Sequence, residues 1–177
     1  RSQARDQRGF AETSHNMGMA YIDIGDLNEA DELLNKALRI TTQTGDQYTE
    51  ANILLSRAEL FTKLKDPVIA GNCAQKALKI HRLFNDPLGI ADAERIIGES
   101  ETALLRYESA ERYLMSSLDC TTKLNHIQGV AQTCEALARL MTASGKTEKV
   151  KHWALKAIEN WKLVGNESAA SALVEFL

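Results

Sequence analysis

The stretch that decides the fold runs from residue 11 to residue 38 and reads AETSHNMGMAYIDIGDLNEADELLNKAL. Four of its small residues are separated by 7, 12 and 7 positions: Ala11, Gly18, Ala30 and Ala37. Asp26 followed by Glu29 resembles a capping box, which marks the start of a helix. The apolar residues around Leu33 and Leu34 fall at helical spacing. The stretch therefore predicts two helices that pack closely where their side chains are small.

The same pattern returns every 40 residues without an insertion or a deletion. The small positions form four columns: Ala11, Ala51, Ala91, Ala131; Gly18, Ala58, Gly98, Ala138; Ala30, Ala70, Ala110, Val150; and Ala37, Ala77, Ser117, Ala157. A fifth column is large and apolar: Leu38, Leu78, Leu118, Ile158. A fixed period of this length is the signature of repeat architectures. Because one helix pair cannot bury its apolar face alone, we expect the repeats to stack.

The punctuation between helices repeats at the same period: Gly45-Asp46, Asn85-Asp86, Asn125-His126 and Gly165-Asn166. Gly and Asn tolerate the left-handed conformation that ends a helix, and Asp or Asn can cap the next one. In Asp66-Pro67 and Asp86-Pro87 the proline fits the first helical position. We therefore predict helices at 7–24, 27–43, 47–64, 67–84, 87–104, 107–123, 127–143, 147–163 and 167–177.

These helices predict an all-α protein, an α-solenoid of antiparallel helix pairs in one domain over residues 1–177. Its repeats span about 7–46, 47–86, 87–126 and 127–166, and residues 167–177 form either a cap or a truncated repeat. Residues 1–5 stand where the tail of a preceding repeat would lie, so we expect the chain to be a fragment of a longer protein.

Composition narrows the class of protein. Hydrophobic residues make up 44% and charged residues 25%, with only 10 Gly and 2 Pro, which is typical of a globular helical chain. The net charge of −3 gives no electrostatic reason to bind nucleic acid or an anionic membrane. No apolar run approaches the ~20 residues that span a bilayer. Three cysteines without a C-x-x-C pair, Cys73, Cys120 and Cys134, favour a reducing, cytoplasmic location and core positions.

The spacing from Gly18 to Ala30 to Ala37, with Tyr21 and Leu34 between, resembles the tetratricopeptide repeat signature. The common repeat of that family has about 34 residues, so this chain is similar to its longer members, as in kinesin light chains, polarity scaffolds and bacterial peptide-sensing regulators. The resemblance implies a right-handed superhelix whose first helices line a concave groove for a protein or peptide. Several such relatives hold peptide backbone with an Asn in successive first helices; here that column reads Asn16, Ser56, Ile96, Ala136.

The resemblance places these further residues in the groove: Glu12, His15, Met19, Asn52, Leu55, Glu59, Asp92, Arg95, Glu99, Gln132, Glu135 and Arg139. Five acidic residues against two arginines give this face a net charge of −3. We expect it to accept a helix or extended segment that carries Lys or Arg, with Met19 and Leu55 as apolar anchors. The alternative is a solvated helical face whose charges have no binding role.

Catalytic and metal-binding patterns are absent from the sequence. There is no G-x-S-x-G, no glycine-rich phosphate loop, and no zinc-ligand spacing among the four histidines. We therefore predict no enzyme activity, no cofactor and no metal. The alternative is an acid–base pair formed by Glu99 and Glu135 across adjacent repeats. His81, His126 and His152 are expected at the surface or at helix ends. Trp153 is expected in the core, and Trp161 either there or against a missing repeat or a second subunit.

The function that follows is a protein-interaction scaffold that binds a partner's peptide or helix. The alternative is a regulatory domain that senses a ligand or peptide and controls an attached signalling or transcription domain. The ends of the array also offer surfaces for self-association.

Overall fold

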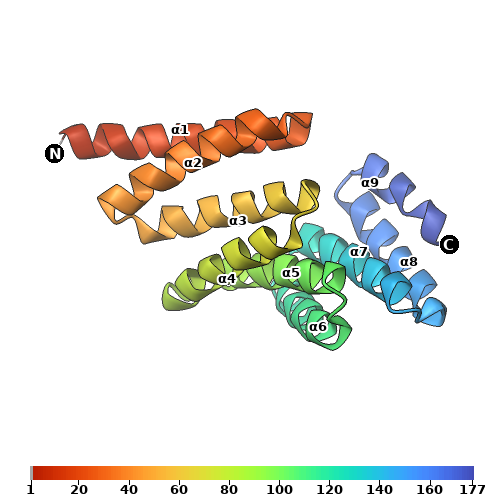
Figure 1. Cartoon of the computed structure of the whole chain (residues 1–177). Coiled ribbons are helices and arrows are strands. Elements are labelled where there is room, and N and C mark those ends of the chain that lie inside the picture. The colour runs from red at the N-terminus through yellow and green to blue at the C-terminus, as the bar shows by residue number, and fades with distance from the viewer. Residues whose placement is uncertain (1) are drawn as a thin grey trace. The chain divides into compact units, whose positions relative to one another are not determined.

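The computed structural model describes the backbone of residues 2–177 and the side chains of residues 7–177. This part excludes residue 1 and the side chains of residues 2–6. The tail of a preceding repeat was predicted at residues 1–5. In the described residues all regular structure is helical (Figure 1): α1 (Ser2–Ile24), α2 (Leu27–Thr44), α3 (Gln47–Lys63), α4 (Pro67–Leu83), α5 (Pro87–Ala103), α6 (Tyr107–Lys123), α7 (Ile127–Ala143), α8 (Thr147–Leu163), α9 (Glu167–Ala172) and the 3₁₀ helix Val174–Phe176. The predicted all-α fold is confirmed.

Two predicted helices differ from the structure. The first helix begins at Ser2 rather than at residue 7. Arg5 stands where Gly45 and Asn85 end the preceding helix, so no residue there favours a left-handed stop. At the other end, the helix predicted over 167–177 ends at Ala172 and continues as a 3₁₀ helix. Its amides bond three residues back, from Leu173 to Ala170 and from Phe176 to Leu173.

The predicted helix boundaries have the predicted conformations. The residues before four of the first helices have positive φ: Gly45 (72°), Asn85 (51°), Asn125 (53°) and Gly165 (74°). Asp46 and Asp86 then cap α3 and α5 by accepting from the amides of Thr49 and Gly89, at 3.2 and 3.1 Å. Lys65 and Leu105 also have positive φ, of 59° and 62°, which their residue types do not predict.

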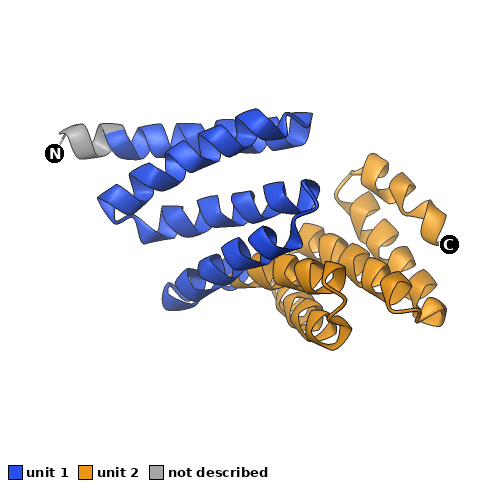
Figure 2. Ribbon diagram, in the orientation of Figure 1, with its two compact units in different colours: residues 1–89 blue, residues 90–177 orange. Residues whose placement is uncertain are grey.

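The first of two compact units comprises residues 1–89 (Figure 2, blue). In it α1 packs on α2, α2 on α3, and α3 on α4. One apolar cluster joins three of these helices and contains Ile22, Ala30, Leu34, Ala37, Ile53 and Leu60. A Cβ added at Gly18 would lie 2.9 Å from Cδ2 of Leu34, so the small residue admits the leucine. This confirms the predicted role of Gly18.

The second unit comprises residues 90–177 (Figure 2, orange). Here α6 packs on α7, α7 on α8, and α8 on α9. A Cβ at Gly98 would lie 2.6 Å from Cγ of Leu114, as at Gly18 in the first unit. Trp161 is buried in this unit's core, with Trp153 packed against it from the edge. Of the two interpretations of Trp161, the core position is confirmed.

His81 lies at a helix end, one of the two predicted places, but it is not at the surface. His81 lies in the last turn of α4, but its side chain is fully buried rather than exposed. A Cβ at residue 89 would lie 2.5 Å from Cγ of His81, so the ring occupies the space that glycine leaves. Asp86 lies 3.1 Å from the ring's Nδ1, and the Tyr48 ring meets it edge-on at 5.9 Å. His126 is the half-buried N-cap of α7, and His152 is exposed on α8.

Candidate protein-binding surface

In the first unit, the predicted binding face lies on α1 and α3. His15 on α1 and Ser56 on α3 are hydrogen-bonded, with 2.8 Å between Nε2 and Oγ. Burial of the His15 ring lowers its pKa below 6.5, so the imidazole is neutral near pH 7. A neutral ring can donate or accept in this bond. The bond holds two consecutive first helices side by side, as the repeat geometry predicts.

The other predicted residues of this unit fall into two groups. Glu12, Asn16 and Met19 are exposed on α1, whereas Asn52, Leu55 and Glu59 are half-buried on α3. Glu12 accepts from Nε of Arg8 at 3.0 Å, and the same Nε lies 3.6 Å from Asp46. Arg8 therefore offsets part of the negative charge at Glu12. Ion pairs this exposed contribute little to stability.

In the second unit, the predicted charges pair within their own helices. Arg95 is buried on α5 and donates to Glu99 at 2.7 Å; Arg139 on α7 donates to Glu135 at 2.9 Å. Both pairs have i,i+4 spacing. Asp92 and Gln132 are half-buried. The six predicted residues of this unit carry three acids and two arginines, a net charge of −1, so most of this face's acidity is neutralised locally.

The end of the chain engages part of the α7 face. The indole Nε1 of Trp161 donates to Glu135 at 3.2 Å, and the Arg139 guanidinium lies 5.6 Å from the centre of the Phe176 ring. Neither Trp161 nor Phe176 was predicted to touch this face. No sequence signal would have found these contacts, because both depend on how α8, α9 and the 3₁₀ helix pack.

The side chains considered for catalysis are paired or buried in the described residues. Glu99 and Glu135 each accept a hydrogen bond from an arginine on their own helix. Burial raises the pKa of the Cys134 thiol to about 11, and it also raises that of Cys73. Cys73 and Cys134 lie in the core as predicted, and Cys120 is half-buried. Within the described part, no cluster of three His, Cys, Asp or Glu side chains is arranged to hold a metal ion.

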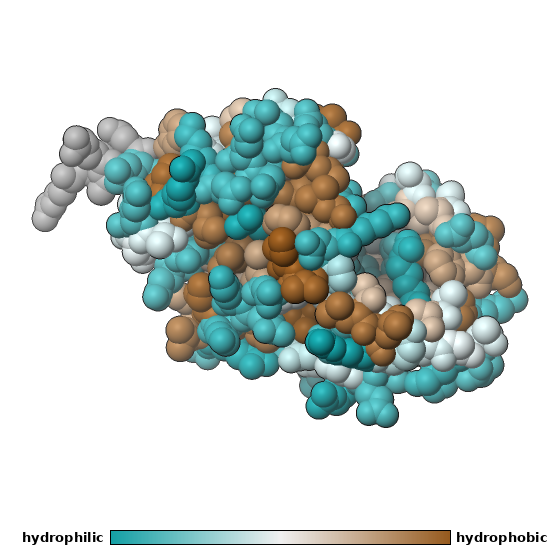
Figure 3. All heavy atoms as spheres, viewed as in Figure 1, coloured by the Kyte–Doolittle hydropathy of each residue, from teal (hydrophilic) through white to brown (hydrophobic). Residues whose placement is uncertain are grey.

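The surface is mixed in polarity. On the face seen in Figure 3, hydrophobic residues (brown) are interspersed with hydrophilic ones (teal) in both units. Exposed apolar side chains include Phe10, Met17 and Met19 on α1 and Met115 on α6. None of the described helices combines the length and the apolar character that crossing a membrane requires.

Antiparallel helix pairs that return every 40 residues define a helical-repeat protein. Residues 9–83 match the family model of the tetratricopeptide repeat. Residues 9–83 are thus similar to tetratricopeptide repeats, and the pattern of small residues continues in the same register beyond residue 83. No protein of curated function matches the sequence.

Solved structures share the fold. A Rap protein in complex with competence and sporulation factor superposes with a TM-score of 0.86 and 18% identity over 94% of this chain and 48% of its own. Aspartyl phosphate phosphatase F from Bacillus subtilis superposes with a TM-score of 0.77 and 17% identity, over 94% of this chain and 44% of its own. BtubC (BKLC) from P. vanneervenii superposes with a TM-score of 0.56 and 16% identity, over 97% of this chain and 88% of its own. The chain spans about half the length of the first two proteins.

Proposed function

We propose that the chain is a protein-interaction module that holds a segment of a partner protein against its first helices. The observation that carries the proposal is the His15–Ser56 hydrogen bond, which sets α1 and α3 side by side. Around this bond, exposed Asn16 and Met19 offer hydrogen bonding and an apolar contact. The match to the tetratricopeptide repeat over residues 9–83 covers both helices. The predicted binding residues of the second unit remain part of the proposal.

The proposed partner segment is basic. In the first unit the predicted residues include Glu12 and Glu59 and no lysine or arginine, which gives a formal net charge of −2 with His15 neutral; Glu12 pairs with Arg8. In the second unit the net charge is only −1, because two arginines pair with Glu99 and Glu135. The first unit is therefore the more favourable place for a Lys or Arg side chain. Leu55, half-buried beside Ser56, supplies an apolar contact.

Selection of random displayed peptides against the chain tests this proposal. We expect the selected peptides to be enriched in Lys and Arg and to bind less tightly to the variant Glu59→Lys. The matched control is Glu32→Lys, which reverses an exposed charge on α2. Equal loss of affinity in both variants would indicate a general charge effect. Peptides without basic enrichment, or affinity unaltered in Glu59→Lys, would refute the basic partner.

A second candidate function is a sensor domain that changes conformation when a peptide binds. The Rap protein that superposes with a TM-score of 0.86 was crystallised with competence and sporulation factor, which favours this candidate. Small-angle scattering of the chain with and without a selected peptide separates the two. A sensor changes its radius of gyration on binding, whereas a rigid scaffold does not.

A further inference from the structure

One side of α8 carries positive charge beside an aromatic ring. We name it the α8 basic stripe, and at helical spacing it contains Lys149, His152, Trp153 and Lys156. Trp153 is half-buried at the edge of the second unit's core, and the other three side chains are exposed. Among the side chains that the structure describes, no carboxylate forms an ion pair with Lys149 or Lys156, whereas Lys146 pairs with Glu111 at 2.9 Å. The two exposed ammonium groups of the stripe therefore remain available to a ligand.

The indole at the centre of the stripe adds an apolar surface between its polar groups. The His152 ring meets the Trp153 ring edge-on, with 4.8 Å between the ring centres. On the other side, Nζ of Lys156 lies 5.5 Å from the centre of the indole. A side chain that contacts the exposed part of the indole therefore lies next to a hydrogen-bonding ring and a cation.

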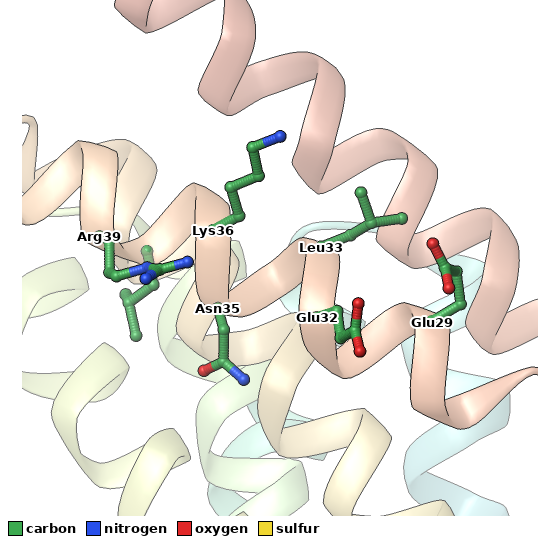
Figure 4. Close-up of a pocket in the computed structure, with 7 residues that line it drawn as sticks. Glu29, Glu32, Leu33, Asn35, Lys36 and Arg39 are labelled. Atoms are coloured by element: carbon green, nitrogen blue, oxygen red, sulfur yellow. The ribbon is translucent and has the colours of Figure 1, made fainter.

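The same four positions on α2 have the same exposure but different chemistry. Figure 4 shows them, three repeats earlier, along a hollow of about 660 Å³: Glu29, Glu32, Leu33 and Lys36. The leucine is half-buried and the other three are exposed, which matches Trp153 and its three neighbours on α8. The repeat thus turns these positions outward whatever residues they hold. The positive charge is therefore a property of α8 and not of the repeat.

The lysines at the start of α8 stand where the helix itself disfavours them. The amino end of a helix carries about half a positive charge, so a cation in the first turn costs stability. Lys149 lies in that turn, and Lys146 at the N-cap position makes no side-chain bond to the helix. By contrast, Asp26 and Asp46 cap α2 and α3. On α8 the lysines therefore add to the positive potential of the helix end.

The positive charge of the second unit is concentrated in this one segment. Residues 146–163 contain five lysines and two glutamates, a net charge of +3, whereas the rest of the unit has a net charge of −5. The 17 residues of α8 span about 25 Å. Exposed charges more than about 8 Å apart are largely screened at physiological ionic strength. A short acidic segment on α8 is therefore attracted, whereas an anionic bilayer or a nucleic acid duplex would extend over the acidic remainder.

We infer that the α8 basic stripe is a docking surface for an acidic helical segment of a partner protein. Lys149 and Lys156 are two helical turns apart, about 10 Å along the axis. Glu or Asp residues seven positions apart on the partner helix have the same spacing and accept from the two lysines. An apolar side chain between them contacts the Trp153 indole. This surface lies in the second unit and takes a segment of opposite charge to the basic partner proposed for the first unit.

Counter-selection of displayed peptides tests this inference. Peptides that bind the unaltered chain but not the double variant Lys149→Glu, Lys156→Glu should be enriched in Asp and Glu. The double variant should bind a selected peptide at least about tenfold less tightly, because two attractions become repulsions, and added salt should weaken binding to the unaltered chain. Because Lys149→Glu places an acid in the first turn of α8, it favours the helix, so weaker binding does not reflect loss of folding.

The matched control is Lys76→Glu, because Lys76 is an exposed lysine on α4 at the position of Lys156 in the repeat. This variant and Glu59→Lys should bind the selected peptides as the unaltered chain does. The inference is overturned if no peptide depends on the two lysines, if the dependent peptides are not acidic, or if Lys76→Glu loses as much affinity. Displacement of the peptide by phosphatidylserine vesicles or duplex RNA at equal charge concentration would overturn it in favour of a lipid or nucleic acid. A dimer of the unaltered chain that the double variant abolishes would overturn it in favour of a second copy.

Discussion

At the residue scale, the packing of the repeats depends on positions where a side chain is missing. Gly89 admits the His81 ring, whereas a Cβ added at Gly9, which stands at the same place in the repeat, would meet no atom within 4 Å. The two glycines therefore have different roles despite their shared register. His81 is rigid and fully buried, so it cannot move aside as a flexible side chain could.

Gly89→Ala should destabilise the chain by about 1–3 kcal/mol, because the new methyl group overpacks against His81. Gly9→Ala is the matched control and should be neutral or stabilising by up to about 1 kcal/mol, since alanine favours helix. Urea denaturation monitored by circular dichroism measures both. Equal stability of the two variants would contradict the contact between residue 89 and His81.

His15 should make stability depend on pH. Burial lowers its pKa in the folded state below 6.5. Above pH 6.5 the His15 imidazole is neutral in both the folded and the unfolded chain, and its contribution to the free energy of unfolding is complete. As the pH falls toward the folded-state pKa this contribution is lost, because the unfolded chain binds the proton first. His15→Gln should flatten this part of the melting temperature profile. His152→Gln, at an exposed position on α8, should leave it unaltered; identical profiles for both variants would refute the assignment.

The buried state of His81 could not be predicted from its own position. Its column reads Thr41, His81, Thr121 and Trp161, which share neither size nor polarity, although all four are buried. The space for the ring comes from Gly89 on the following helix. The residue types in the column of His81 therefore cannot predict a space that Gly89, in a different column, leaves.

At the scale of the helix, most boundaries were predictable because residues that end or cap helices stand at them. Eight helices, α2 to α9, begin at their predicted residues, and Gly or Asn with positive φ or a capping Asp precedes many of them. The errors fall at α1 and after Ala172, where such marks are absent or a 3₁₀ turn intervenes. The residues that end one helix and cap the next therefore account for the correct helix boundaries, and their absence accounts for the wrong ones.

The start of α6, like those of α7 and α8, lacks the side-chain cap that other helices of the chain have. Arg106 precedes α6 without a side-chain bond to the helix, whereas Asp66 accepts from the amide of Ile69 at 3.0 Å before α4. The two residues have similar backbone angles, with φ of −95° and −107°. Residue 106 is therefore in a conformation that a capping side chain can use.

Arg106→Ser should be more stable than Arg106→Ala by about 0.5–2 kcal/mol, because serine can cap the helix. The alanine variant is the control for losing the exposed ion pair between Arg106 and Glu101. Thermal unfolding of both variants gives the difference. No difference, or a less stable serine variant, would show that the helix start cannot accept a cap.

At the scale of the whole molecule, the predicted binding residues show where sequence reasoning stops. The i,i+4 spacing of Arg95–Glu99 and Glu135–Arg139 could have predicted that these charges pair within their own helices. The contact between His15 and Ser56 joins residues 41 positions apart, and the repeat register made their proximity predictable. The contact of Arg139 with Phe176 was not predictable, because the terminal segment leaves the repeat pattern.

Leu173→Ala should destabilise the second unit by about 2–5 kcal/mol, because it empties a fully buried position of the core. Leu177→Ala, at a half-exposed position, is the matched control and should change stability little. Differential scanning calorimetry of both variants tests the predicted capping role of residues 167–177. Similar transitions for the two variants would favour a truncated repeat with no capping role.

The chain's two tryptophans, Trp153 and Trp161, both lie on α8 in the second unit. Light absorbed selectively by indole is therefore emitted from the last repeat alone, with no contribution from residues 1–89. The emission of Trp161 should respond when its carboxylate neighbour Glu135 gains another partner. A ligand confined to α1 and α3 would leave that emission unchanged, so the unlabelled protein already carries an optical reporter of which half has been engaged.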